Sequence, residues 1–146
     1  FIKIFYIDRL ILISKLIDGN FPDYTRVIPS NNNNHLKVNR SNLLAAVDRV
    51  STIANEKSPS IKFKLLKNLI NLSAINSENS TATEDIEVDY DGSEIEIGFN
   101  SRYIMDILDN LESEEIKISF NDNSSPIIVQ EKSSIDNIYV LMPMRV

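Results

Sequence analysis

The chain of 146 residues contains no cysteine, a single histidine and only three glycines. The absence of cysteine excludes a disulfide framework and thiolate chemistry, which fits a reducing cytosol. One histidine, His35, is too few for a zinc site built from Cys and His ligands. The chain also lacks the glycine-rich loop that cradles nucleotide phosphates. From these absences we expect no cofactor, no bound metal and no catalytic residues.

Long uninterrupted apolar runs are also missing. The first 17 residues are rich in Ile, Phe and Tyr, but Lys3, Asp8, Arg9 and Lys15 interrupt them. They match neither a membrane-spanning helix nor a signal peptide, so we expect a cytoplasmic protein with no membrane partner. The net charge is −6 and the pI is near 4.8. Proteins that bind nucleic acid through a broad phosphate-binding face are usually basic, so any DNA contact must work despite the average charge.

What the chain does contain is a strand–helix–strand–strand–strand unit that occurs twice in tandem. Alternating and helical apolar spacing defines the elements. For the first copy, this spacing predicts a strand at 35–39 and a helix at 41–55 with Ser41 as N-cap. Three strands follow, at 61–66, 69–75 and 86–90. Asp91-Gly92 is predicted to form a hairpin turn into the second copy. That copy is predicted to have a strand at 95–99 and a helix at 101–111 capped by Asn100 or Ser101. Three strands follow, at 116–120, 127–130 and 138–142.

Two such copies predict an α+β protein in which two helices pack on antiparallel sheets. In front of them, residues 1–7 and 10–17 are predicted to form a hairpin, followed by a turn-rich connector. The polar run 31–34 is interpreted as a solvated linker and a domain boundary. Because the chain begins at Phe1, in the middle of a pattern, we interpret it as a piece of a longer protein. The apolar strands of its first 17 residues are then expected to drive self-association.

Four segments together resemble one known family: LIDGNFPDYTRVIP, NEKS, EIGFNSRYIMDIL and YVLMPMRV, at 16–29, 55–58, 96–108 and 139–146. The resemblance is to the bacterial DNA polymerase III beta subunit, the replicative sliding clamp, and it extends from about Leu12 to Val146. It implies a DNA-clamp fold, with residues 35–146 as the third clamp domain. Residues 1–34 would be the end of the middle domain and the interdomain connector. Family members are non-catalytic, and two subunits close head-to-tail into a ring around double-stranded DNA.

The resemblance also implies three sets of site residues. The first is a groove for short peptides of the polymerase III alpha subunit, the clamp loader and other partners: Pro22, Arg26, Val27, Asn100, Tyr103, Val140, Leu141, Met142, Pro143, Met144 and Arg145. The second faces DNA: Arg40, Arg49, Lys57 and Arg102. The third forms the ring interface: Thr52, Ile53, Glu84 and Glu87. Pro143 is expected to end the last strand and to leave the following residues at the surface.

Plainer interpretations stand beside these. The charged residues are also explained as solvated helix faces, and residues 140–142 as an ordinary core strand. Ser58, Ser124 and Pro126 depart from residues common in the family near the groove. A chain with one of the two ring surfaces is expected not to close a ring alone. The alternative function is a free-standing peptide-binding adaptor that encircles no DNA, and a weaker third hypothesis is a hydrolase that uses the acidic residues near Asp89 and Asp91.

Overall fold

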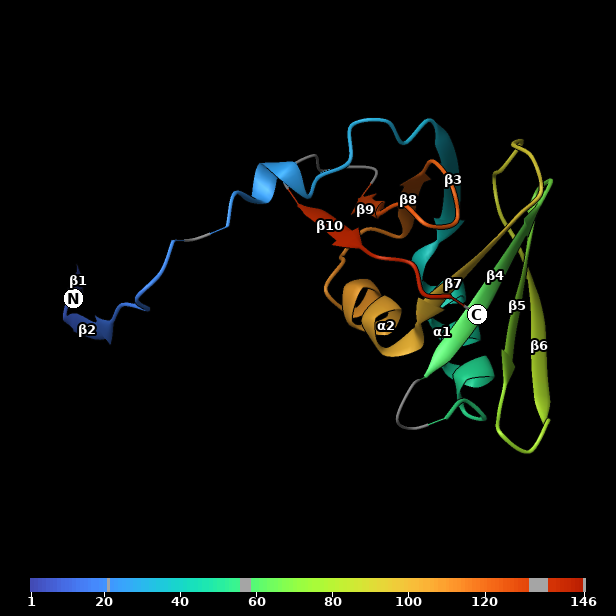
Figure 1. Cartoon of the computed structure of the whole chain (residues 1–146), viewed down its shortest axis with the longest axis horizontal. Coiled ribbons are helices and arrows are strands. Elements are labelled where there is room, and N and C mark those ends of the chain that lie inside the picture. Colours follow the sequence, from blue (N-terminus) through green and yellow to red (C-terminus); the bar gives the residue numbers. More distant parts are fainter. Residues whose placement is uncertain (21, 56–58, 132–136, 146) are drawn as a thin grey trace.

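The computed structural model of the chain describes residues 1–20, 22–55, 59–131 and 137–145, and Figure 1 shows the arrangement of its elements. Lys57 and Ser58, which the resemblance places at the DNA-facing surface and the groove edge, lie outside the described residues. The elements are β1 (Ile2–Ile7), β2 (Leu10–Lys15), the 3-10 helix η1 (Tyr24–Arg26), β3 (Asn34–Asn39), α1 (Arg40–Ser51), β4 (Ser60–Leu66), β5 (Leu69–Ile75), β6 (Thr81–Glu87), β7 (Ile95–Asn100), α2 (Ser101–Asp109), β8 (Glu115–Phe120), β9 (Ile127–Glu131) and β10 (Ile138–Leu141).

The predicted tandem unit is confirmed. The first copy is β3-α1-β4-β5-β6 and the second is β7-α2-β8-β9-β10. Each copy gives its first strand to the sheet of the other, because β3 pairs with β8 and β7 pairs with β4, both antiparallel. The two four-stranded sheets have the orders β10-β9-β8-β3 and β6-β5-β4-β7. The α+β class with two helices on antiparallel sheets is therefore confirmed, and neither copy completes a sheet without the other.

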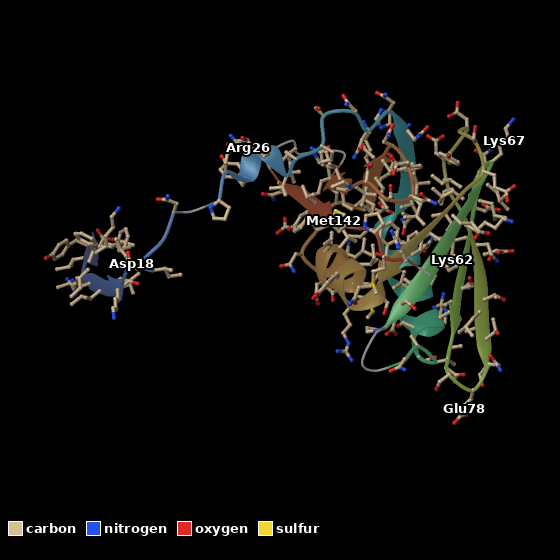
Figure 2. All side chains as sticks on the ribbon, in the orientation of Figure 1. Asp18, Arg26, Lys62, Lys67, Glu78 and Met142 are labelled. Carbon is tan, nitrogen blue, oxygen red and sulfur yellow. The ribbon has the colours of Figure 1, made fainter. Side chains whose placement is uncertain are left out.

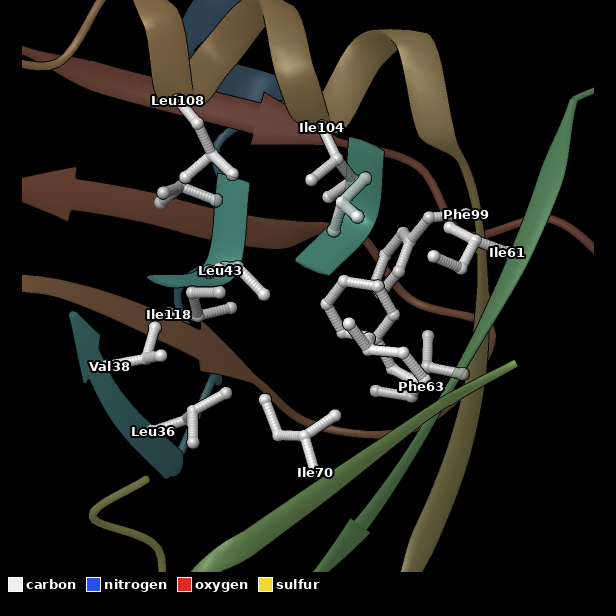
Figure 3. Close-up of a cluster of buried hydrophobic side chains, with 14 of the residues drawn as sticks. Leu36, Val38, Leu43, Ile61, Phe63, Ile70, Phe99, Ile104, Leu108 and Ile118 are labelled. Carbon is white, nitrogen blue, oxygen red and sulfur yellow. The ribbon is translucent and has the colours of Figure 1, made fainter. Parts of the chain in front are cut away.

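One hydrophobic core lies where the sheets and helices meet, as the close-up in Figure 3 shows. Its largest fully buried side chains come from both sheets and both helices: Leu36, Leu43, Ile61, Leu65, Ile70, Leu72, Phe99, Ile104, Leu108, Ile116, Phe120 and Ile127. Phe63 and Phe99 meet edge to face across the β4–β7 pair, with ring centroids 5.1 Å apart. Because full burial of one such side chain stabilises a fold by about 1.5–3 kcal/mol, this shared core binds the two copies into one unit.

Both helices begin directly after a strand, at an asparagine that ends it. Asn39 Oδ1 accepts the Asn42 N–H at 2.9 Å, and Asn100 Oδ1 accepts the Arg102 N–H at 3.0 Å. Asn100 is thus one of the two caps predicted for α2. The prediction that Ser41 caps α1 is wrong, because the helix starts at Arg40 and Asn39 already binds an unpaired N–H of its first turn.

The last strand of the first copy lies earlier than predicted. The apolar pattern predicts a strand at 86–90, but β6 starts at Thr81 and pairs with β5. The reason is Asn76, whose side-chain oxygen accepts the N–H groups of Glu78 and Ser80 and closes a tight turn. Since β6 has few apolar residues, the alternation that identifies other strands is weak there.

The prediction of a hairpin turn at Asp91-Gly92 is also wrong. The strands it would join, β6 and β7, lie at opposite edges of one sheet, and Gly92 has no positive φ. Glycine is needed for space instead, because a Cβ at this position would lie 2.5 Å from the Tyr90 hydroxyl oxygen. That hydroxyl bends back over Gly92 and donates to the Ser93 carbonyl at 2.6 Å.

The predicted hairpin at the start of the chain is present, and Figure 1 shows it apart from the rest of the fold. β1 and β2 pair antiparallel from Ile2 opposite Lys15 to Ile7 opposite Leu10, and every residue of both strands is exposed. The polar run that follows is less solvated than predicted. Asn34 opens β3, and half-buried Asn32 donates its amide to the carbonyls of Ser119 and Pro126.

Replacing Gly92 with alanine is expected to lower the free energy of unfolding by about 1–3 kcal/mol, the usual cost of overpacking. The added methyl group meets the Tyr90 ring, which is 2% exposed and packs against Phe120, so it cannot swing aside. Urea unfolding of Gly92→Ala measures the change. Gly19→Ala is the matched control, because no atom lies within 4 Å of its added Cβ. Equal stability of the two variants would contradict this explanation.

Deleting residues 1–17 is expected to abolish self-association of the chain. The hairpin exposes apolar side chains on both faces and two unpaired strand edges, and such edges pair with other copies. Light scattering after size exclusion, over a range of protein concentrations, compares the deleted and intact chains. If the deleted chain associates as strongly as the intact one, another surface is responsible.

Candidate functional site

The C-terminal segment, residues 140–145, carries most of the expected groove residues and lies on the surface beside β7. The Met144 N–H donates to the Gly98 carbonyl at 2.8 Å, which ties this segment to the second sheet. Pro143 ends β10 as predicted, but Met144 is not released, because it is half-buried and forms this bridge. Arg145 is exposed. The bridge therefore brings the segment next to the strand that leads into α2.

Two large apolar side chains of this segment are exposed, Val140 and Met142, and Tyr103 is exposed on α2 (Figure 2 labels Met142). Tyr103 and Met142 are each 57% exposed, and Val140 is 37% exposed. Leu141, between them, is only 7% exposed and belongs to the core. The plainer interpretation of residues 140–142 as a core strand therefore fits Leu141 alone. An apolar surface with a flexible methionine suits the binding of apolar peptide side chains.

The connector between the hairpin and β3 carries the other expected groove residues. Asp23 caps η1 by accepting the Thr25 N–H and hydroxyl, and it also pairs with Arg26 at 3.2 Å. Pro22 and Val27 are exposed. No hydrogen bond described for the chain joins these three groove residues to the C-terminal segment, so the structure holds the two parts of the expected groove by separate elements.

The loop between β8 and β9 holds Ser124 and Pro126, the two departures from the family pattern that the structure describes. Asp122 folds this loop, because its carboxylate accepts the N–H and hydroxyl groups of both Ser124 and Ser125 at 2.7–2.8 Å. The backbone N–H of Ser124, followed by the other three donors, holds the pKa of Asp122 well below its ordinary value. Ser124 thus has a local structural role in this loop, which the family resemblance alone does not reveal.

The residues expected to face DNA are engaged within the fold to different degrees. Arg40 is half-buried and donates Nη1 to the Leu108 carbonyl at 3.0 Å, so it binds the C-terminal turn of α2. Arg49, near the end of α1, donates to both carboxylate oxygens of Glu84, at 3.0 and 2.5 Å. Arg102 is exposed on the first turn of α2. The helices that carry these residues pack against each other.

The four residues expected at the ring interface come from two neighbouring elements, since the end of α1 contacts β6. Thr52 ends the helix and donates its hydroxyl to the Arg49 carbonyl at 2.8 Å. Ile53 packs against the core. Glu84 and Glu87 lie on β6, and the hydrogen bonds from Arg49 hold the pKa of Glu84 below its ordinary value. Arg49 thus links the expected DNA-facing and interface sets, which the sequence alone had separated.

Two further residues make contacts that hold the C-terminal segment and the connector, and the sequence pattern does not predict them. Gly98 receives the C-terminal segment, and Asn32 binds the β8–β9 region. Asn32 is one of four consecutive asparagines, so no local signal distinguishes it from its neighbours. Within the described ranges, no group of three or more His, Cys, Asp or Glu side chains is placed to hold a metal ion. No helix in that part of the chain is long and apolar enough to cross a membrane.

Residues 25–145 match the family described as DNA polymerase III beta subunit, C-terminal domain. The beta sliding clamp of Caulobacter vibrioides is 44% identical over 135 residues, which cover 92% of this chain and 36% of that relative. The beta sliding clamp of Escherichia coli K12 is 36% identical over 140 residues, which cover 96% of this chain and 38% of the relative.

The fold is similar to that of solved clamps as well. The crystal structure of a sliding clamp from Bartonella birtlesii bound to griselimycin has a TM-score of 0.94 and 38% identity to this chain. The similarity covers 98% of this chain and 38% of the Bartonella chain. This chain therefore spans little more than a third of the length of its relatives.

Replacing Asp122 with asparagine is expected to flatten the acid side of the stability profile. Its pKa is lowered in the folded state, so the carboxylate stabilises the fold fully above its unfolded pKa, about 3.9. That contribution is lost as the pH falls toward the lower folded pKa. Thermal unfolding between about pH 5 and pH 2 should show the difference between wild type and Asp122→Asn shrinking with acidity. Asp109→Asn, at an exposed carboxylate, is the control, and a difference independent of pH would refute the role given to Asp122.

Proposed function

This chain belongs to the family of DNA polymerase III beta subunits, and on that basis we propose that it acts as the C-terminal part of a sliding clamp in DNA replication. The observation that carries the proposal is the match of residues 25–145 to the C-terminal domain of that subunit. The family is one of non-catalytic processivity factors. Its members work where bacterial DNA is replicated, so the proposed location is the cytoplasm.

The proposed domain boundary lies before the tandem unit. We assign residues 35–146 to the third clamp domain, and residues 1–34 to the end of the middle domain and the connector. Two features support this assignment: β1 and β2 form a sheet of their own, and β3–β10 surround one core. The connector between them is exposed over most of its length.

The proposed DNA partner is duplex held inside a ring, without readout of base sequence. Such binding needs diffuse positive charge rather than aimed hydrogen bonds, and an acidic exterior confines DNA to the hole. Arg49 and Arg102 are the exposed members of the expected set within the described residues, and the Arg49 guanidinium pairs with Glu84. Arg40 keeps its positive charge while half-buried against the Leu108 carbonyl, whereas the Glu84 carboxylate offsets the charge of Arg49 locally.

Ring closure would use the end of α1 and the β6 edge. Thr52 and Ile53 lie at the helix end, and Glu84 and Glu87 lie on β6, which is an edge strand of its sheet. A head-to-tail ring closes when each subunit carries two complementary surfaces. We propose that this edge is one of them and that the other lies in the remaining two thirds of the length of the relatives.

The second proposed activity is docking of short peptides from the polymerase III alpha subunit and the clamp loader. Tyr103, Val140 and Met142, here called the docking surface, supply exposed apolar area on α2 and on the segment that the bridge between Met144 and Gly98 ties to β7. Exposed apolar groups that cluster on a folded surface favour partner binding. The connector residues Arg26 and Val27 would complete the site from the other side.

A free-standing adaptor that binds peptides but encircles no DNA is the alternative, favoured by the docking surface lying wholly within this chain. The two functions differ in their topology on DNA. The chain, mixed with a polypeptide that supplies the first two domains of a clamp relative, should form a complex that stays on nicked circular DNA and slides off linear DNA. Equal retention on both DNA forms, or no complex, would favour the adaptor.

Alanine at Met142 or Tyr103 is expected to weaken peptide docking at least about fivefold, as removal of a well-placed anchor does. The probe is a fluorescein-labelled peptide that carries the clamp-binding motif of the polymerase III alpha subunit, followed by fluorescence anisotropy. Ile75→Ala is the matched control, because Ile75 is 60% exposed on β5 of the other sheet. Equal affinity of all three variants for the peptide would place docking elsewhere on the chain.

A further inference from the structure

Asn32 is attached to the folded body by both hydrogens of its amide. Nδ2 donates to the carbonyl of Ser119, in β8, at 3.0 Å and to the carbonyl of Pro126, just before β9, at 2.9 Å. The side chain is half-buried, unlike those of Asn31 and Asn33, which are exposed. One side chain therefore spans the two ends of the β8–β9 loop.

This attachment is the first described hydrogen bond, counted from the start of the chain, that reaches the tandem unit. Among the described hydrogen bonds, those of residues 1–31 stay within that stretch, and Asn32 makes the first that reaches the tandem unit. Asn34 adds a second anchor, because its Nδ2 donates to the Asn121 carbonyl at 3.0 Å. Together with the half-buried Ile28 and Pro29, the anchors at residues 32–34 therefore set the position of η1 relative to the sheets.

The receiving side of the attachment is held by its own hydrogen bonds and burial. The Asp122 carboxylate gathers Ser124 and Ser125 into a closed loop, and this loop leads directly into Pro126, one of the two acceptors. The other acceptor, Ser119, lies in β8 and is 6% exposed. Because Asn32 binds both a strand and an ordered loop, the connector is already partly ordered. Less conformational entropy is then lost when a peptide binds.

We propose that Asn32 is a positioning residue, which holds the connector so that Arg26 and Val27 face the docking surface when a peptide binds. This rests on the proposed docking function. Val27 precedes Asn32 by five residues, so it stays within about 18 Å of the anchor even in a fully extended chain. Loss of the anchor frees those residues to move, and peptide binding must then order them again.

The test uses the labelled alpha-subunit peptide and the intact chain. Asn32→Ala is expected to weaken binding about three- to tenfold, the range that loop-ordering costs of this kind produce. Asn33→Ala, which alters the exposed neighbour, should bind as the unaltered chain does. Asn32→Asp keeps the shape but removes both donors, so it should bind at least as weakly as the alanine variant. Binding is measured well below the unfolding temperature of each variant.

A purely structural role of Asn32 is distinguished by coupling to Val27. If Asn32 acts by positioning the connector, Asn32→Ala should have little further effect in a Val27→Ala background. In the free protein, relaxation of the Val27 amide should also show faster motion in Asn32→Ala. Independent, multiplicative effects, or unchanged affinity in Asn32→Ala, would overturn the role of Asn32 alone. No binding of the peptide by the unaltered chain would overturn the docking function together with it.

Discussion

The exchange of first strands between the two copies is the constraint on which the rest of the structure depends. Because β3 completes the sheet of the second copy and β7 that of the first, each sheet contains strands from both halves of the unit. The same two strands, β3 and β7, also lead directly into the helices, because Asn39 and Asn100 at their ends cap α1 and α2. The helices cannot shift without disturbing both sheets, and this fixes the surfaces that flank them.

Apolar periodicity was enough to predict most of this fold. Alternation in β4, β5, β7 and β8 and helical spacing in α1 and α2 place the tandem unit correctly, because burial of these faces drives folding. The errors occur where a side chain binds the backbone or fills space. Asn76 closes a tight turn, so that β6 begins at Thr81, earlier than the apolar pattern predicts. Gly92 makes room for Tyr90 rather than supplying a positive φ. Such local contacts leave no periodic trace in the sequence.

The candidate site is predictable in part for the same reason. Exposure of Tyr103 and Met142, large apolar residues, agrees with a binding surface that the sequence motifs had suggested. The pairing of Arg49 with Glu84 joins residues 35 positions apart on different elements, so no spacing rule could find it. Asn32 differs from Asn31 and Asn33 only by its surroundings. These residues acquire distinct roles from tertiary contacts, which a single sequence does not display.

In each copy, the segment after the last strand binds the first strand of that copy, but the two copies do so with different numbers of contacts. In the first, the chain after β6 joins β3 through two backbone hydrogen bonds between Lys37 and Asp89, whose side chains also form an ion pair at 2.8 Å. In the second, the described closure is a single hydrogen bond from Met144 to Gly98. A closure held by one backbone hydrogen bond opens at a lower cost in free energy than one held by two such bonds and an ion pair. Within the duplicated unit, the C-terminal segment is therefore the closure that a bound partner displaces more easily, while the corresponding closure of the first copy keeps the scaffold intact.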